Sequence, residues 1–131
     1  MKTVMSGLDL RAIANELSQM AGSHCKKCYQ PHYEQVVLRL RAKSGGNTDL
    51  VLVRGKRIYT SQRDRPMPQY PAPFAMVLRK VLTNARLKAV EQVGFDRVLR
   101  FIFENSHGTF HLYVEVFRDG NIILTDGDDL I

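Results

Sequence analysis

The chain has 131 residues, of which 44% are hydrophobic and 24% charged, and its 19 basic and 13 acidic side chains give a net charge of +6. This length and composition are typical of one globular domain and exclude a disordered chain. The two cysteines are too few for a disulfide scaffold. No apolar run is long enough to cross a membrane, and no signal-peptide pattern opens the sequence. We therefore expect a cytoplasmic protein without a membrane partner.

The charge is spread unevenly along the chain. Residues 26–65 carry ten basic and three acidic side chains, residues 66–100 carry six and two, and residues 101–131 carry one and six. A positive field of this kind attracts polyanions, and nucleic acid is the polyanion that a cytoplasmic domain most often binds. A charge that serves solubility alone is the alternative.

Hydrophobic spacing predicts the first elements. An apolar stripe at helical spacing predicts a helix that starts near Ser6 and Asp9, a pattern like a capping box, and ends before Gly22. From Lys26 the period changes to two, which predicts an antiparallel meander with tight turns. Its predicted strands are the half-buried segment 36–41, the segment 50–53 and the short segment 58–60.

A polar, proline-rich stretch separates this first half from a second one. Residues 61–73 contain four of the five prolines, and Pro71-Ala72-Pro73 suits the first turn of a second helix whose apolar stripe runs from Phe74 to Leu82. Alternation then predicts strands at about 86–93, 96–104, 109–117 and 121–126. The order helix, meander, helix, meander predicts an α+β fold with two antiparallel sheets, arranged like a sandwich, and two main helices.

Few residues offer catalytic or metal-binding chemistry. Cys25 and Cys28 form a C-x-x-C pair with His24 and His32 nearby, but structural zinc normally takes a second ligand pair from farther along the chain. We interpret the cysteines as incidental surface or core residues, and we expect no metal and no cofactor. No phosphate-binding loop and no G-x-S-x-G signature is present. We therefore expect no catalytic residue and no enzymatic activity.

Basic side chains in the segment 74–101 are candidates for phosphate contacts. A solvated helix face with exposed strand positions is the alternative. Asp96 and Arg97 form either a local ion pair or an acid and a base that bind base amino groups and phosphates. Asp9, taken alone, is most simply an acid that favours the start of the first helix. The basic residues of this segment are Arg79, Lys80, Arg86, Lys88, Arg97 and Arg100.

Several short motifs, taken in order, resemble the NFACT-N domain, which is the N-terminal domain of fibronectin-binding-protein-A-like and ribosome quality-control proteins. The resemblance implies that residues 1–131 are one NFACT-N domain, expected to be an N-terminal fragment of a longer multidomain protein. It also implies a fold similar to the N-terminal domain of formamidopyrimidine DNA glycosylases. The matching motifs are Met5–Leu10, Tyr29–Pro31, Phe74–Lys80, Leu82–Arg86, Gln92–Arg97, Val114–Phe117 and Gly120–Leu124.

The resemblance implies a module that binds tRNA and the large ribosomal subunit with an obstructed nascent chain. Such a module would belong to a ribosome-associated quality-control factor that supports mRNA-independent C-terminal tailing of the stalled chain. Family members engage tRNA with an acid near the first helix and an Asp-Arg pair, which map to Asp9, Asp96 and Arg97. The resemblance therefore favours a tRNA-binding role for Asp9 over the simpler interpretation as an acid that stabilises the start of the first helix. Three basic residues match family positions, and we interpret them as phosphate contacts: Arg79, Lys80 and Arg86.

Other interpretations stay open. A fibronectin-binding-type adhesion module is one, although no signal peptide or anchor is visible. A non-catalytic nucleic-acid-binding domain related to DNA glycosylases is another. Those enzymes use an N-terminal proline amine beside a Glu as nucleophile, and the start Met1-Lys2-Thr3 lacks both. An incomplete domain exposes an edge strand, so self-association of the fragment is a further expectation.

Overall fold

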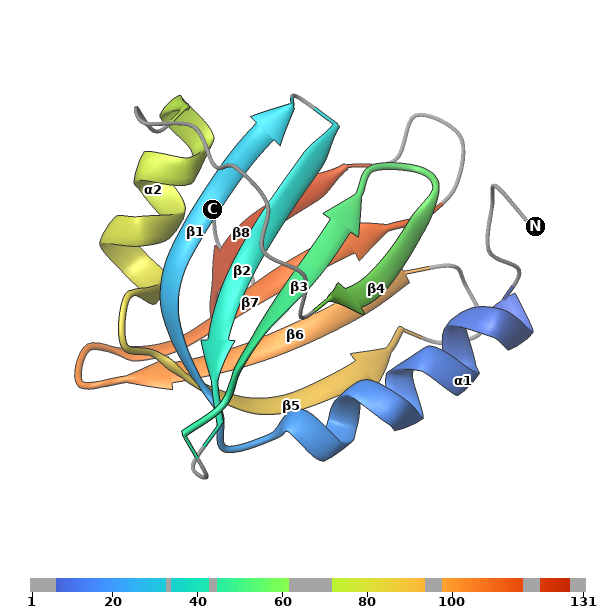
Figure 1. Ribbon diagram of the computed structural model, residues 1–131, viewed down its shortest axis with the longest axis horizontal. Coiled ribbons are helices and arrows are strands. Elements are labelled where there is room, and N and C mark those ends of the chain that lie inside the picture. Colours follow the sequence, from blue (N-terminus) through green and yellow to red (C-terminus); the bar gives the residue numbers. More distant parts are fainter. Residues whose placement is uncertain are drawn as a thin grey trace.

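The computed structural model describes residues 7–32, 34–42, 45–61, 72–93, 98–116 and 121–127, with the backbone alone for residues 7–10. No helix in these ranges is long and apolar enough to span a membrane. The elements appear in Figure 1 in this order: α1 (Gly7–Leu17), the short 3₁₀ helix η1 (Ser18–Met20), β1 (His24–His32), β2 (Gln35–Arg41), β3 (Asn47–Val53), β4 (Arg57–Ser61), α2 (Pro73–Leu82), β5 (Arg86–Gln92), β6 (Val98–Asn105), β7 (Gly108–Glu115) and β8 (Ile122–Asp126).

The eight strands within the described residues belong to one antiparallel sheet, in the order β4-β3-β2-β1-β5-β6-β7-β8. The expectation of two separate sheets was therefore wrong. The two predicted meanders are joined where β1 meets β5, through the register pair of His24 with Arg86. The amide of Cys25 donates to the carbonyl of Ala85 at 2.8 Å, which extends the junction.

The two halves of the sheet, β1–β4 and β5–β8, nevertheless share one core. Leu38 and Leu50 from the first half lie in the same buried cluster as Phe101, Phe103 and Leu112 from the second. In Figure 1 the strands β1–β4 lie over β6–β8. The sheet is thus bent upon itself at the junction of β1 and β5, and its inner faces pack as the faces of a sandwich do.

The two helices lie at separate sides of the bent sheet (Figure 1). α1 packs alongside β5. Its Ala14 and Leu17 are buried in the shared core. α2 packs alongside β1. It begins at Pro73, as expected from the proline at its first turn. Asn84, with φ of 63°, turns the chain after α2 towards β5. The residues that α2 buries are Ala75, Leu78 and Leu82.

β1 lies where no strand was predicted, and β2 is more buried than expected. β1 carries a register shift between Cys25 and Lys27, which interrupts the alternation of buried and exposed residues. In β2, Val37 is fully buried although it faces away from the shared core. It packs with Tyr29 and Val51 in a second, smaller cluster on the outer face of β1–β4.

Candidate nucleic-acid interface

The fold brings the start of α1, which carries Asp9, towards the end of β5. Asp9 is in the first turn of α1, and its side chain lies outside the described residues, as do Asp96 and Arg97 themselves, between β5 and β6. The Oγ of Ser18, directly after α1, donates to the carbonyl of Val90 in β5 at 3.2 Å. α1 runs back along β5 from this contact, so its start lies near the end of β5 (Figure 1).

The three predicted phosphate contacts lie elsewhere. Arg79 and Lys80 are on α2, which packs alongside β1. Arg86 opens β5, and the length of that strand, roughly 20 Å, separates it from Gln92 at the other end, towards which α1 begins. Nη2 of Arg86 pairs with Oε1 of Glu104 at 3.3 Å. The structure therefore does not gather the predicted basic residues at the same end as Asp9.

A different group of basic residues gathers on the outer face of β1–β4. We call it the tyrosine–arginine face, made of Tyr29, Arg39, Arg57, Tyr59 and Arg79. The guanidinium carbons of Arg39 and Arg79 lie 5.4 and 5.3 Å from the ring centroid of Tyr29. That of Arg57 lies 5.3 Å from the ring centroid of Tyr59. The negative face of each ring attracts the cations stacked on it.

Hydrogen bonds fix two of these guanidinium groups. Nε of Arg79 donates to the carbonyl of Cys28 at 2.8 Å. Nε and Nη2 of Arg39 donate to the two carboxylate oxygens of Asp49 at 2.9 and 3.2 Å. The side chain of Asp49 is only 6% exposed, so this ion pair is shielded from water on its acidic side. Fixed guanidinium groups lose little side-chain entropy when they bind phosphate.

The register of the strands places further positive charge on this face, because residues directly opposite each other in an antiparallel pair share a face. Lys27 stands opposite Arg39, and Arg41 stands opposite Asn47. Both Lys27 and Arg41 are exposed. Two cations opposite each other repel. The face therefore carries a positive charge that Asp49 balances only in part.

Sequence reasoning named Arg79 but missed the other four residues of this face, and several of its other candidate phosphate contacts are paired with acids. Arg100 pairs with Glu91, with Nη2 and Oε1 2.6 Å apart. Hydrogen bonds with Tyr113 and Glu91 raise the pKa of Arg100 above its ordinary value. The signal that pointed to the missed face was the excess of ten basic over three acidic side chains in residues 26–65.

Cys25 and Cys28 are core residues, which settles the alternative that the sequence left open. Both are fully buried, and their Sγ atoms lie 3.6 Å apart. The hydrogen bond with Cys28, together with burial, raises the pKa of the Cys25 thiol far above its ordinary value. Among the residues that the structure describes, no group of three or more His, Cys, Asp or Glu side chains is placed to hold a metal ion.

These features define a class of α+β protein built on one bent antiparallel sheet, with a helix at each of two sides and an arginine-rich outer face. The family model described as NFACT N-terminal and middle domains matches residues 6–131. The chain belongs to this family, and the resemblance drawn from the sequence is confirmed.

Curated relatives with similar sequences are named for ribosome quality control. The archaeal Rqc2 homolog aRqcH of Methanocaldococcus jannaschii is 37% identical over 136 residues, which cover 100% of this chain and 20% of that protein. Ribosome quality control complex subunit 2 of Saccharomyces cerevisiae is 37% identical over 129 residues, which cover 96% of this chain and 12% of that protein. The chain therefore spans a fifth or less of these relatives.

The fold matches a solved structure, the N-terminal domain of the fibronectin-binding protein PavA of Streptococcus pneumoniae, with a TM-score of 0.83 at 30% identity. The match covers 92% of this chain and 49% of that one. The antiparallel sheet with two helices is thus shared with that domain. The expected likeness to formamidopyrimidine DNA glycosylases stays a prediction.

Proposed function

We propose that the chain is the tRNA- and large-ribosomal-subunit-binding module of a ribosome quality-control factor in the cytoplasm, and that it binds without catalysing a reaction. The names of its relatives as ribosome quality-control subunits support this function. In the proposal, the complete factor acts on a subunit with an obstructed nascent chain and supports mRNA-independent C-terminal tailing of that chain.

The observation that carries the proposal is that the start of α1 lies near the end of β5, although the two are far apart in the sequence. Ser18, directly after α1, donates to Val90 of β5, and from there α1 runs antiparallel to β5, so that its first turn lies towards the end of that strand (Figure 1). The proposal assigns tRNA binding to the residues of these segments, Asp9, Asp96 and Arg97. Carboxylates accept hydrogen bonds from base amino groups, and a guanidinium group binds phosphates or base edges.

In the proposal the tyrosine–arginine face, with Lys80 on α2, adds contacts to the RNA backbone. Such contacts raise affinity without selecting a sequence. Lys27, which is exposed and stands opposite Arg39 on this face, adds a further cation to which a phosphate can bind. This contribution falls as the salt concentration rises.

The test is a salt-titrated binding assay of the 131-residue chain with tRNA, with duplex DNA as competitor. The double variant Asp96→Ala/Arg97→Ala keeps the net charge, because it removes one acid and one base. We expect it to weaken tRNA binding about tenfold, which corresponds to the loss of one good base or phosphate contact. The matched control is Glu34→Ala/Lys56→Ala, which removes an exposed ion pair that the proposal does not use.

The control variant should bind tRNA as the parent chain does, and duplex DNA should compete poorly. Unchanged tRNA affinity in the Asp96→Ala/Arg97→Ala variant would contradict the site. Equal and weak binding of tRNA and duplex DNA would contradict a specific function and would leave a general positive field. Fibronectin in place of tRNA tests the adhesion alternative in the same assay.

A further inference from the structure

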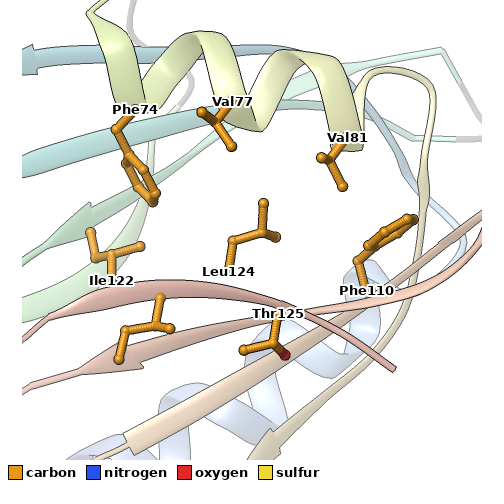
Figure 2. A pocket seen from close by; sticks show the side chains of 8 residues that line it. Phe74, Val77, Val81, Phe110, Ile122, Leu124 and Thr125 are labelled. Carbon is orange, nitrogen blue, oxygen red and sulfur yellow. The ribbon is translucent and has the colours of Figure 1, made fainter. Parts of the chain in front are cut away.

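An apolar groove of about 460 Å³ lies between α2 and the strands β7 and β8 (Figure 2). Side chains from α2 form one wall, and side chains from β7 and β8 form the other. Thr125 is the one polar residue among those that line it. The lining residues are Phe74, Val77, Val81, Phe110, Ile122, Ile123, Leu124 and Thr125.

One of the two strongly exposed apolar side chains of α2 lines the groove, and the other is its neighbour in the sequence. Met76 is 57% exposed and Val77 49% exposed, and these two are the exposed large hydrophobic residues in the described part of the chain. Both lie in one turn of α2, and Val77 also lines the groove. Single exposed apolar residues are ordinary, whereas a group of them beside an apolar groove marks an interaction site.

We propose that this groove receives an apolar segment of the additional chain that longer members of the family carry. The chain covers 49% of the solved PavA domain, which has the same fold. In that domain, therefore, about as much chain again accompanies this fold. A segment tethered to the same molecule has a high effective concentration, so even a groove of this modest size is filled when the segment is present.

The chemistry of the lining identifies the occupant. Because aliphatic and aromatic side chains form both walls, the groove suits a segment that inserts leucine, isoleucine or phenylalanine. No cationic side chain is among the described residues that line it, and the inference does not depend on RNA binding. A second copy of this chain is the competing occupant.

The test measures whether Val77 is covered. Val77→Cys places a thiol on the groove wall, and Thr60→Cys places one at an exposed position of β4 as the matched control. Each variant is made in the 131-residue chain and in the same chain lengthened by the residues that follow the matched region in the archaeal relative. The rate of maleimide modification is followed by mass spectrometry, and the buried Cys25 and Cys28 stay unmodified while the fold is intact.

We expect modification at position 77 to be about tenfold slower in the lengthened chain, which corresponds to about 90% docking. Modification at position 60 should be the same in both lengths. Equal rates at position 77, with Cys25 and Cys28 unmodified, would overturn the proposal.

Two further outcomes are also decisive. If the lengthened chain does not fold, its extension is added as a separate polypeptide to the 131-residue Val77→Cys chain. Slowing then supports the proposal, and the absence of slowing at saturating concentration overturns it. If position 77 of the 131-residue chain is protected only at high protein concentration, and sedimentation shows a dimer, a second copy fills the groove and the proposal is wrong.

Discussion

Cys25 and Cys28 face the same core although they are three positions apart in a strand. On a regular strand, positions three apart point to opposite faces. The register shift between Cys25 and Lys27 adds one residue to β1, so Cys25 stands opposite Leu40 and Cys28 opposite Leu38. A sequence pattern cannot show this, because the bulge is set by pairing with β2. The two thiols therefore belong to the core and not to a surface motif.

Burial should make these thiols unreactive in the folded protein. A free thiol has a pKa of about 8.5, so its reactive thiolate becomes abundant between about pH 7 and 9. The raised pKa of Cys25 keeps its thiol protonated through this range. We expect alkylation in native buffer to be about 100-fold slower than in urea, because it needs local opening. Rapid native labelling that increases with pH around 8.5 would contradict this prediction.

At the scale of elements, the turns between strands show which local sequence signals were sufficient to predict the structure. Glycines at 45, 55 and 108 have φ of 100°, 69° and 135°. Gly45 and Gly55 lie between strands whose pairing was predicted, and Gly108 opens β7 directly after such a turn. The second helix was likewise predicted from its proline and apolar stripe. β1 was not predicted, because its bulge and its two exposed lysines hide the alternation. Within the described residues, local patterns therefore predicted these turns, the helices and the regular strands.

The turn between β6 and β7 offers a test of backbone conformation alone. A Cβ at Gly108 would meet no atom within 4 Å, but φ of 135° is a conformation that side chains rarely adopt. Gly108→Ala should therefore lower the free energy of unfolding by about 1–3 kcal/mol. Gly46→Ala is the control, because a Cβ there also meets open space and φ is not positive. It should change stability by about 0.5 kcal/mol or less.

Urea denaturation of both variants gives the two changes in the free energy of unfolding. The dependence of this free energy on urea concentration is compared with that of the parent chain. If both variants lose the same free energy of unfolding, an alanine side chain tolerates the positive φ at position 108, and the prediction is wrong.

At the scale of the whole molecule, the sequence predicted a basic, two-part α+β protein but not how its parts join. His24 and Arg86, whose pairing unites the two meanders, lie far apart in the chain, and no local pattern records such a contact. The same limit applied to the candidate site. Charge counting located positive residues in the first half, but the stacking of Arg39 and Arg79 on Tyr29 depends on α2 packing beside β1.

The shared core predicts that the two halves of the sheet unfold together. Leu38 of β2 and Phe103 of β6 lie in one buried cluster and are fully buried. Phe103→Leu should lower the free energy of unfolding by about 1 kcal/mol. If unfolding is a single cooperative transition, the slowest-exchanging amides of β2 should lose the same free energy of protection as those of β6. Native-state hydrogen exchange measures both in one experiment. Loss confined to β5–β8 would mean that the halves are separate units, coupled only through the short junction of β1 with β5.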